Sequence, residues 1–157
     1  MGWFGFGKSN NDKKHDSLIK NVKWHNKGES LVKLEKFEEA ISCYNRVIRL
    51  DPQDLKAWSN KGFALINLEK YEEAISCYNQ VIRFNSKDYN AWFNRGNSLA
   101  NLRKYEEAIS CYNRVIKINP DDASAWRHKS MVLKKLGVNE EAEKCFTKSK
   151  ELGFVRK

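Results

Sequence analysis

Four tryptophans stand at a fixed interval of 34 residues, and this interval restricts the possible folds more than any other feature of the sequence. The same register aligns small residues, leucines, aromatic residues and cysteines, and whole strings recur, such as KYEEAISCYNQVI and KYEEAISCYNRVI. The tryptophans are Trp24, Trp58, Trp92 and Trp126. Self-similarity at a period of this size indicates a chain of stacked structural units, each of which packs mainly against its neighbours.

Each unit has the pattern of two successive amphipathic helices. Trp24, Gly28 and Leu31 have the spacing of one helical face, and a second stripe of the same kind runs over residues 37–48. Aspartates that can cap a helix N-terminus precede each new unit: Asp54, Asp88 and Asp122. Paired glutamates favour the start of each second helix, and Pro52 and Pro120 favour the end of two of them. The sequence therefore predicts one helical hairpin in each of four units, at residues 21–54, 55–88, 89–122 and 123–156.

A column of glycines occupies the first helix of the first three units. These glycines are expected to lie opposite a column of alanines in the second helix; the pairs are Gly28 and Ala40, Gly62 and Ala74, and Gly96 and Ala108. Glycine inside a helix costs about 1 kcal/mol relative to alanine, so a glycine that recurs at one register indicates a close contact. We expect the two helix backbones of each hairpin to approach each other closely there.

The 34-residue period, with its columns of tryptophan, glycine, leucine, tyrosine and alanine, resembles the tetratricopeptide repeat family over residues 21–154. The resemblance implies an all-α fold, a right-handed α-solenoid of four antiparallel helix–turn–helix hairpins. The fourth unit departs from the pattern at Ser130, Asn139, Ser149 and Phe154. Polar residues in place of buried ones suit the open end of a stack, so we predict that the fourth repeat is degenerate and caps the solenoid.

Positive charge is concentrated towards the two ends of the chain. The net charge is +9, yet residues 37–122 carry as many acidic as basic residues. A continuous basic stripe, which nucleic-acid binding would require, is therefore not indicated. No segment approaches the roughly 20 apolar residues of a membrane span, and no secretory signal is recognisable. These features predict a cytoplasmic protein that neither spans a membrane nor binds nucleic acid.

Residues 1–15 are expected to form a flexible tail ahead of a repeat domain at residues 16–157, with the first helix starting at Asp16 or Ser17. The tail carries aromatic residues followed by lysines, a composition that also suits weak contact with a membrane surface or docking on a stack. Residues 2–9 spell the phosphate-loop pattern G-x4-G-K-S. That loop acts between a strand and a helix, and only Met1 precedes the pattern, so we expect no nucleotide binding.

No arrangement of residues predicts catalysis. The cysteines share one column of the repeat: Cys43, Cys77, Cys111 and Cys145. Equivalent positions in adjacent hairpins lie about 10 Å apart, which is too far for a disulfide and keeps four thiols from converging on one metal. The three histidines share no metal-binding spacing and form no set with a nucleophile. We therefore expect reduced thiols, no bound metal, no cofactor and no enzymatic activity.

A ladder of asparagines runs along the first helices, and the family resemblance implies that these helices line the concave face of the stack. The ladder consists of Asn26, Asn60 and Asn94, with His128 in the fourth repeat. An amide both donates and accepts hydrogen bonds, which is what contact with the main chain of an extended peptide requires. The alternative is that recent duplication copied the asparagine without any use for it, and the near-identity of the repeats keeps this alternative open.

Apolar side chains accompany the ladder, and together they predict an extended peptide ligand with one or two hydrophobic residues. The predicted groove residues are His25, Asn26, Glu29, Lys56, Asn60, Phe63, Asn90, Phe93, Asn94, Asn97, Arg127, His128 and Met131. Some family members grip a C-terminal carboxylate with lysine and arginine at set groove positions. Those positions hold His25, Asn90 and Asn94 in one frame and Ser59, Ser124 and His128 in the other, so we do not expect this kind of binding.

The sequence as a whole favours a protein-interaction scaffold that binds an extended segment of a partner protein. A second hypothesis is a self-associating structural subunit, which would use the ends of the stack or the aromatic tail to form a homo-oligomer. A third is recruitment to an acidic surface by the basic ends of the chain.

Overall fold

The computed structural model describes residues 10–153, and it describes their side chains from His15 onward. This part of the chain consists of helices and short turns, without strands, so the predicted all-α fold is confirmed. The helices are α1 (Asn10–Lys33), α2 (Phe37–Leu50), α3 (Leu55–Asn67), α4 (Tyr71–Phe84), α5 (Tyr89–Asn101), α6 (Tyr105–Ile118), α7 (Ala123–Lys135) and α8 (Asn139–Glu151). None of the helices in residues 10–153 is long and apolar enough to cross a membrane.

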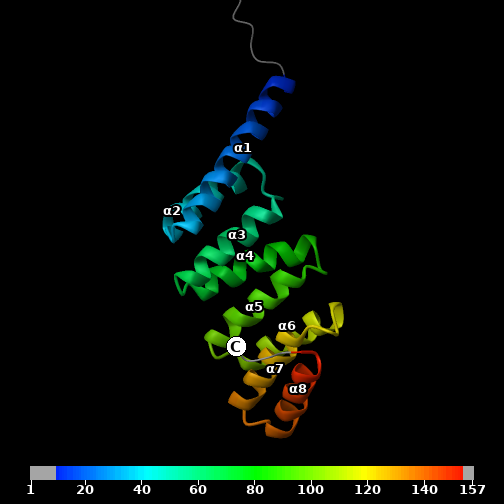
Figure 1. Cartoon of the computed structure of the whole chain (residues 1–157). Coiled ribbons are helices and arrows are strands. Elements are labelled where there is room, and N and C mark those ends of the chain that lie inside the picture. The colour runs from blue at the N-terminus through cyan, green and yellow to red at the C-terminus, as the bar shows by residue number, and fades with distance from the viewer. Residues whose placement is uncertain (1–9, 154–157) are drawn as a thin grey trace, which may run out of the picture.

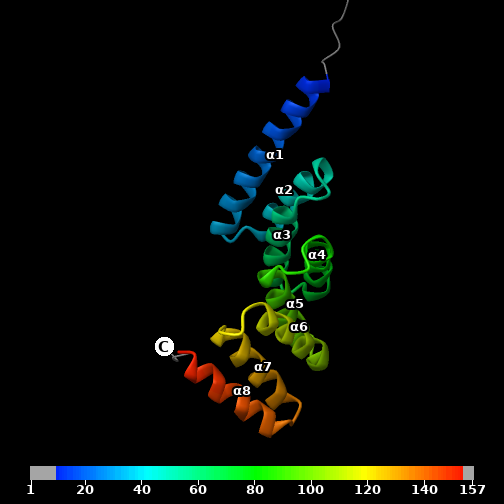
Figure 2. The same cartoon turned by 90° about the vertical axis from the view of Figure 1, so that its right-hand side faces the viewer.

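The helices pair in chain order into four hairpins that stack into an elongated solenoid (Figures 1 and 2). Within each hairpin the two helices pack together, and the first helix of each new hairpin packs on the second helix of the one before. Successive first helices also touch, α1 with α3 and α3 with α5. Each hairpin therefore completes its neighbour's core, and the predicted stack of four helical hairpins is confirmed.

The ends of the helices follow the predicted capping chemistry. One carboxylate oxygen of each capping aspartate accepts a hydrogen bond from the backbone N–H three residues later; the pairs are Asp54 and Ala57 at 2.8 Å, Asp88 and Ala91 at 2.8 Å, and Asp122 and Ala125 at 2.6 Å. The second helices α2, α4 and α6 end in the same way, although Ser86 stands after α4 where the other junctions have proline. Proline therefore suits this junction but is not required to end the helix.

The turn inside each hairpin places one residue in the left-handed backbone region. In the first three repeats that residue is not glycine: Glu35, Glu69 and Arg103 have φ of 57°, 57° and 60°. In the fourth repeat it is Gly137, with φ of 79°. The N–H of the following residue closes the turn on the first helix in every case, for example from Lys70 to the carbonyl of Leu65 at 2.9 Å. This is the hydrogen-bond pattern of a Schellman helix end.

Buried tyrosines are the closest neighbours of the glycine column, closer than the alanines that the sequence analysis placed opposite it. A Cβ atom added at Gly62 would lie 2.8 Å from the ring of Tyr78, and the first and third repeats repeat this contact. The nearest ring atoms are those of Tyr44 for Gly28, at 2.7 Å, and of Tyr112 for Gly96, at 2.9 Å. The spacing within one helix shows that a close contact exists, but it does not identify the residue of the second helix that makes it.

The first helix begins at Asn10, earlier than the expected start at Asp16. The stretch from residue 10 to 15 contains no proline or glycine, and its asparagines and aspartate suit a helix N-terminus. The helix therefore extends past the edge of the stack, and Figure 1 shows α1 projecting beyond α2. The aromatic residues and phosphate-loop pattern of residues 1–9 lie outside the described part of the chain.

Candidate functional site

A hollow of about 290 Å³ lies between α1 and α3, on the face formed by the first helices. Its lining residues are Glu29, Val32, Lys33, Tyr44, Asn60 and Phe63. The structure thus brings together three residues of the predicted groove from two different repeats. Phe63 is 47% exposed, so a large part of its apolar side chain is open to contact with a ligand. Lys56 lies at the rim and forms an ion pair with Glu29 at 2.7 Å.

His25 contributes to the junction between repeats and is not free to act as a groove contact. Its Nε2 lies 2.8 Å from the second carboxylate oxygen of Asp54, the residue that caps α3. Both side chains are largely buried, at 13% and 15% exposure. Burial of Asp54 favours the neutral acid, but hydrogen bonds from His25 and from the Ala57 N–H outweigh it and hold the pKa of Asp54 below its usual value.

The asparagine ladder meets the tyrosine hydroxyls of the preceding repeat. The Asn60 amide interacts with the Tyr44 hydroxyl. Burial, and to a smaller extent the Glu29 carboxylate, raise the pKa of that hydroxyl to about 12, whereas the Asn60 amide lowers this pKa. The Asn94 amide approaches the Tyr78 hydroxyl in the same way. That contact falls short of hydrogen-bond geometry, so the buried Tyr78 hydroxyl has no hydrogen-bond partner among the described residues.

The two ends of the ladder differ from its middle. Within the described residues no second helix of an earlier hairpin packs against Asn26, and its side chain is exposed to solvent. At the other end His128 replaces asparagine, and its ring lies 5.9 Å from the Tyr112 ring while its Nδ1 is 2.8 Å from the carbonyl oxygen of Ser124. Part of the ladder therefore has a structural role, because a buried hydroxyl needs a polar neighbour. Each amide still retains hydrogen-bonding groups that a ligand can use.

Phe93 lies in an aromatic cluster and is only partly available as a contact. Its ring is 4.9 Å from that of His128 and 6.0 Å from each of Tyr89 and Tyr112. The Tyr89 hydroxyl also donates to a carboxylate oxygen of Asp122, the cap of α7. Sequence reasoning did not select Tyr89, although it is the one aromatic residue in its column of the repeat.

The remaining predicted residues divide between internal contacts and open surface. Asn97 accepts a hydrogen bond from the Tyr112 hydroxyl at 2.8 Å, whereas Asn90 is exposed. Met131 is 51% exposed and lines a hollow of about 580 Å³ between α7 and α8, together with Arg127 and Phe146. The Arg127 guanidinium covers the Phe146 ring at 4.6 Å. Among the predicted groove residues, the large apolar side chains that are exposed are therefore Phe63 and Met131, and they line two separate hollows.

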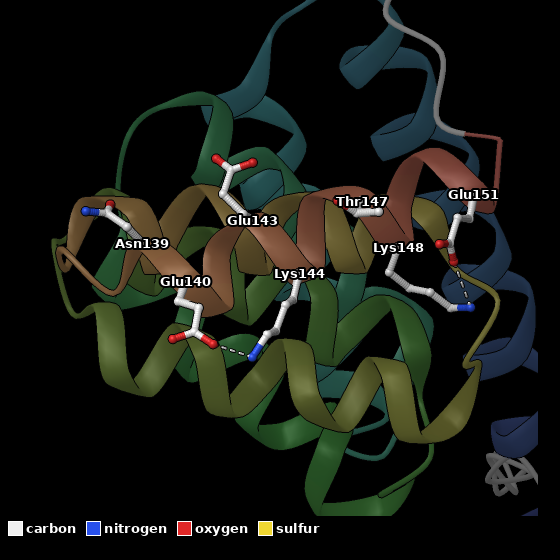
Figure 3. A pocket seen from close by; sticks show the side chains of 7 residues that line it. All are labelled: Asn139, Glu140, Glu143, Lys144, Thr147, Lys148 and Glu151. Atoms are coloured by element: carbon white, nitrogen blue, oxygen red, sulfur yellow. Dashed lines mark hydrogen bonds and ion pairs between the residues drawn. The ribbon is translucent and has the colours of Figure 1, made fainter.

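The outer face of α8 is polar, as an end cap requires. Figure 3 shows seven side chains of this one helix, with ion pairs between Glu140 and Lys144 at 2.6 Å and between Lys148 and Glu151 at 3.4 Å. Both pairs are exposed to solvent, where such interactions stabilise a protein by at most about 1 kcal/mol. All seven of these residues are polar or charged, so this surface lacks the large apolar side chains that join the other hairpins.

The cysteines are buried free thiols, in agreement with the sequence analysis. Burial raises the pKa of the Cys77 thiol to about 11, and it also raises the pKa of the other three thiols. Arg95 donates to the Cys111 sulfur at 2.9 Å, yet burial still dominates. A thiol in such an environment is a poor nucleophile. Within the described residues no three His, Cys, Asp or Glu side chains converge on a common metal position.

Comparison with solved structures agrees with this architecture. A crystal structure of MamA is similar over 94% of this chain and 96% of that chain, with a TM-score of 0.81 and 19% identity. MamA from Desulfovibrio magneticus RS-1 is similar over 84% of this chain and 75% of that one, with a TM-score of 0.81 and 20% identity. The first tetratricopeptide domain of Spaghetti (RPAP3), bound to the HSP90 peptide SRMEEVD, covers 76% of this chain and 94% of its own, with a TM-score of 0.73 and 28% identity.

Comparison at the level of sequence identifies the repeat itself. No curated protein matches the chain. The tetratricopeptide repeat model, however, matches residues 23–54, 55–88 and 89–122, which are the first three of the four hairpins. The unmatched hairpin α7–α8 is the one in which serine replaces glycine and polar residues replace apolar ones. The chain therefore belongs to the tetratricopeptide repeat family.

Proposed function

We propose that this protein is an interaction scaffold that binds an extended segment of a partner protein along the face formed by α1, α3, α5 and α7. The observation that carries the proposal is the hollow between α1 and α3, where the Asn60 amide lies beside the exposed Phe63 ring. Such a site joins one apolar anchor to one group that both donates and accepts hydrogen bonds, as peptide-binding sites do. The four free cysteines suit a reducing compartment, which favours the cytoplasm.

The similar domain that binds an HSP90 peptide supports a peptide ligand for this chain. A site that binds the C-terminal carboxylate of a peptide needs cations, however, and the groove of this chain lacks them at the required positions. Where such a site has lysine and arginine, this chain has His25, Asn90 and Asn94. His25 is also held by its contact with Asp54. Glu29 adds a carboxylate to the same hollow. Because Glu29 is paired with Lys56 at 2.7 Å and Lys33 is the one cation in the lining, the hollow lacks the set of cations that grips a terminal carboxylate. We therefore propose that the ligand is an internal segment with an apolar side chain that packs on Phe63.

Three variants test this proposal by isothermal titration of a peptide selected from an array of internal, apolar-containing peptides. Phe63→Ala and Asn60→Ala are each expected to weaken binding about tenfold, because a contact hot spot is worth about 1–2 kcal/mol. Tyr44→Phe is the matched control, since it removes the internal partner of Asn60 and leaves the amide in place. Equal loss in Tyr44→Phe and Asn60→Ala would show that the amide acts only within the stack, and unchanged binding in Phe63→Ala would refute the proposed anchor.

A second candidate function, self-association, is favoured by the projecting part of α1. Leu18, Ile19 and Val22 are each more than half exposed there. Sedimentation velocity at increasing protein concentration tests this candidate, with Leu18→Gln/Ile19→Gln as the variant. Association of the wild type that the double variant abolishes would support it, and a monomer at every concentration would exclude it.

A further inference from the structure

We propose a second binding site, separate from the groove, which takes an acidic peptide segment in a basic cleft between the α4–α5 loop and the C-terminal half of α6. The cleft has a volume of about 530 Å³. Its lining residues are Ser86, Lys87, Trp92, Arg114, Lys117 and Ile118. Three of these six side chains are cationic and none is acidic.

The wall of the cleft is a tryptophan that the fold holds in place. Trp92 donates its indole N–H to the carbonyl oxygen of Ser86 at 2.9 Å, and the Arg114 guanidinium lies 5.9 Å from the centre of the ring. Asn94 comes two positions after Trp92, which is a rotation of about 200° around a helix, so the indole lies on the side of α5 opposite the ladder. The cleft and the groove can therefore be tested independently.

The cations of the cleft have no carboxylate partner. Within residues 15–153, ion pairs join other lysines to glutamates, but Lys87, Arg114 and Lys117 take part in none of them. The nearest acid in the loop sequence, Asp88, uses a carboxylate oxygen to cap α5 through the Ala91 N–H. Three like charges around one concavity repel one another, and an anionic ligand relieves that repulsion.

Comparison with the other repeats shows that the combination of all three cations occurs only in the third repeat. Only the third repeat has a cation at the position of Lys87. The equivalents in chain order are Ile19, Gln53 and Asp121 for Lys87, then Arg46, Gln80 and Lys148 for Arg114, and Arg49, Arg83 and Glu151 for Lys117. At the fourth repeat Glu151 pairs with Lys148, the equivalent of Arg114. The repeats are otherwise nearly identical, so copying of a repeat does not explain a residue such as Lys87 that the other repeats lack. The three cations occur together only where they surround a cleft.

The shape of the cleft favours a peptide over other polyanions. A hollow with the indole of Trp92 and the exposed Ile118 on its wall accepts an apolar side chain, which a nucleic-acid backbone does not offer. The acidic residues Asp121 and Glu151 at the equivalent positions of the fourth repeat interrupt any continuous basic track. A flat membrane surface does not fill a concavity. A short segment of glutamates or aspartates next to one aliphatic residue matches both the charge and the wall.

Nuclear magnetic resonance of the full chain tests the site, because the Trp92 indole N–H gives its own signal. The probe is an end-blocked peptide of glutamate and aspartate with a central leucine, and the control peptide has glutamine and asparagine in their place. The variant Lys87→Gln/Arg114→Gln/Lys117→Glu carries residues that this chain already holds at positions 53, 80 and 151, so it is expected to fold. Asn60→Ala/Phe63→Ala serves as the groove control.

The acidic peptide is expected to shift the Trp92 indole signal, and the triple variant is expected to bind about tenfold more weakly, as loss of charge-assisted contacts predicts. The groove control is expected to bind as the wild type does. An unmoved indole, equal binding of the neutral peptide or equal binding by the triple variant would each overturn the proposal. Inorganic phosphate that shifts the indole as strongly as the peptide would mean that the site takes an isolated anion. An indole shifted only by vesicles of phosphatidylcholine and phosphatidylserine would mean that it takes a membrane surface.

Discussion

The third and fourth hairpins share one architecture but pack their aromatic residue differently. In α5–α6, Tyr112 is buried to 1% exposure and its ring lies over Gly96. In α7–α8 the equivalent residue, Phe146, is half-buried and the glycine is replaced by Ser130. The tyrosine is covered because another hairpin follows it, whereas Phe146 is covered by the cations of Arg127 and Lys150 at 4.6 and 4.2 Å.

This difference shows which repeat columns depend on a following hairpin. The tyrosine and the glycine form one unit, since the ring occupies the space that a Cβ atom would need. Where no hairpin follows, the ring is not confined and a serine fits beside it. The next repeat therefore determines the residues at these two positions, and the first helix alone does not.

The largest effect should come from truncating the aromatic residue. Tyr78→Ala is expected to lower the free energy of unfolding by about 4 kcal/mol, because a fully buried aromatic leaves a cavity. Phe146→Ala is expected to cost about 1–2 kcal/mol, because that ring is already partly exposed to solvent. Urea unfolding followed by circular dichroism measures both values. Equal losses would mean that the fourth hairpin is as tightly packed as the others.

Exchange of the small residues should give the next largest effect. Gly62→Ser places the residue of the fourth repeat against the Tyr78 ring and is expected to cost about 2 kcal/mol through overpacking. Ser130→Gly is the reverse exchange and is expected to cost less than about 1 kcal/mol, the difference in helix propensity. If Gly62→Ser were stabilising, the close approach of the tyrosine would not be the reason for the glycine.

The repeat boundaries and capping residues were predictable from the sequence because they depend on local chemistry. The aspartate caps Asp54, Asp88 and Asp122 act within one turn of helix, so their spacing alone identifies them. The start of α1 was not predictable in the same way. Residues 10–15 lie before the first apolar stripe, where the amphipathic pattern gives no signal and helix propensity alone decides.

The candidate site was predicted only in part, because its contacts cross from one repeat to the next. The Tyr44–Asn60 and Tyr78–Asn94 pairs are each sixteen positions apart, 44 to 60 and 78 to 94, and no single helix reveals that they meet. Phe63 was found because it is an apolar residue at a position of the first helix that the packing of the hairpin does not use. The basic cleft beside Trp92 was missed because its cations come from a loop and from a second helix.

Substitutions in the hairpin turns should change the free energy of unfolding by a smaller amount, with opposite signs in the second and fourth repeats. Glu69→Gly is expected to stabilise the protein by about 1 kcal/mol, because residue 69 has φ of 57° and glycine adopts that region without steric cost. Gly137→Ala is expected to destabilise the fourth repeat by a similar amount, since φ there is 79° and no neighbouring atom compensates. Urea unfolding distinguishes the two signs. A destabilising Glu69→Gly would mean that the glutamate contributes an interaction larger than its backbone strain.

The smallest expected effect is a difference between two junctions of the stack in how their contribution to the free energy of unfolding depends on pH. Asp54 and Asp88 cap α3 and α5 in the same way, but only Asp54 also contacts a histidine, since Ser59 stands where the first repeat has His25. A carboxyl with a lowered pKa stabilises the folded state fully above the unfolded pKa of about 4, and this contribution is lost as the pH falls through the folded pKa. Asp54→Asn keeps the cap and is expected to cost about 0.5 kcal/mol at pH 7 and progressively less as the pH falls below about 4. Asp88→Asn is the matched control in urea unfolding at each pH, and an equal, pH-independent cost for both variants would show that the histidine contact does not stabilise the ionised Asp54.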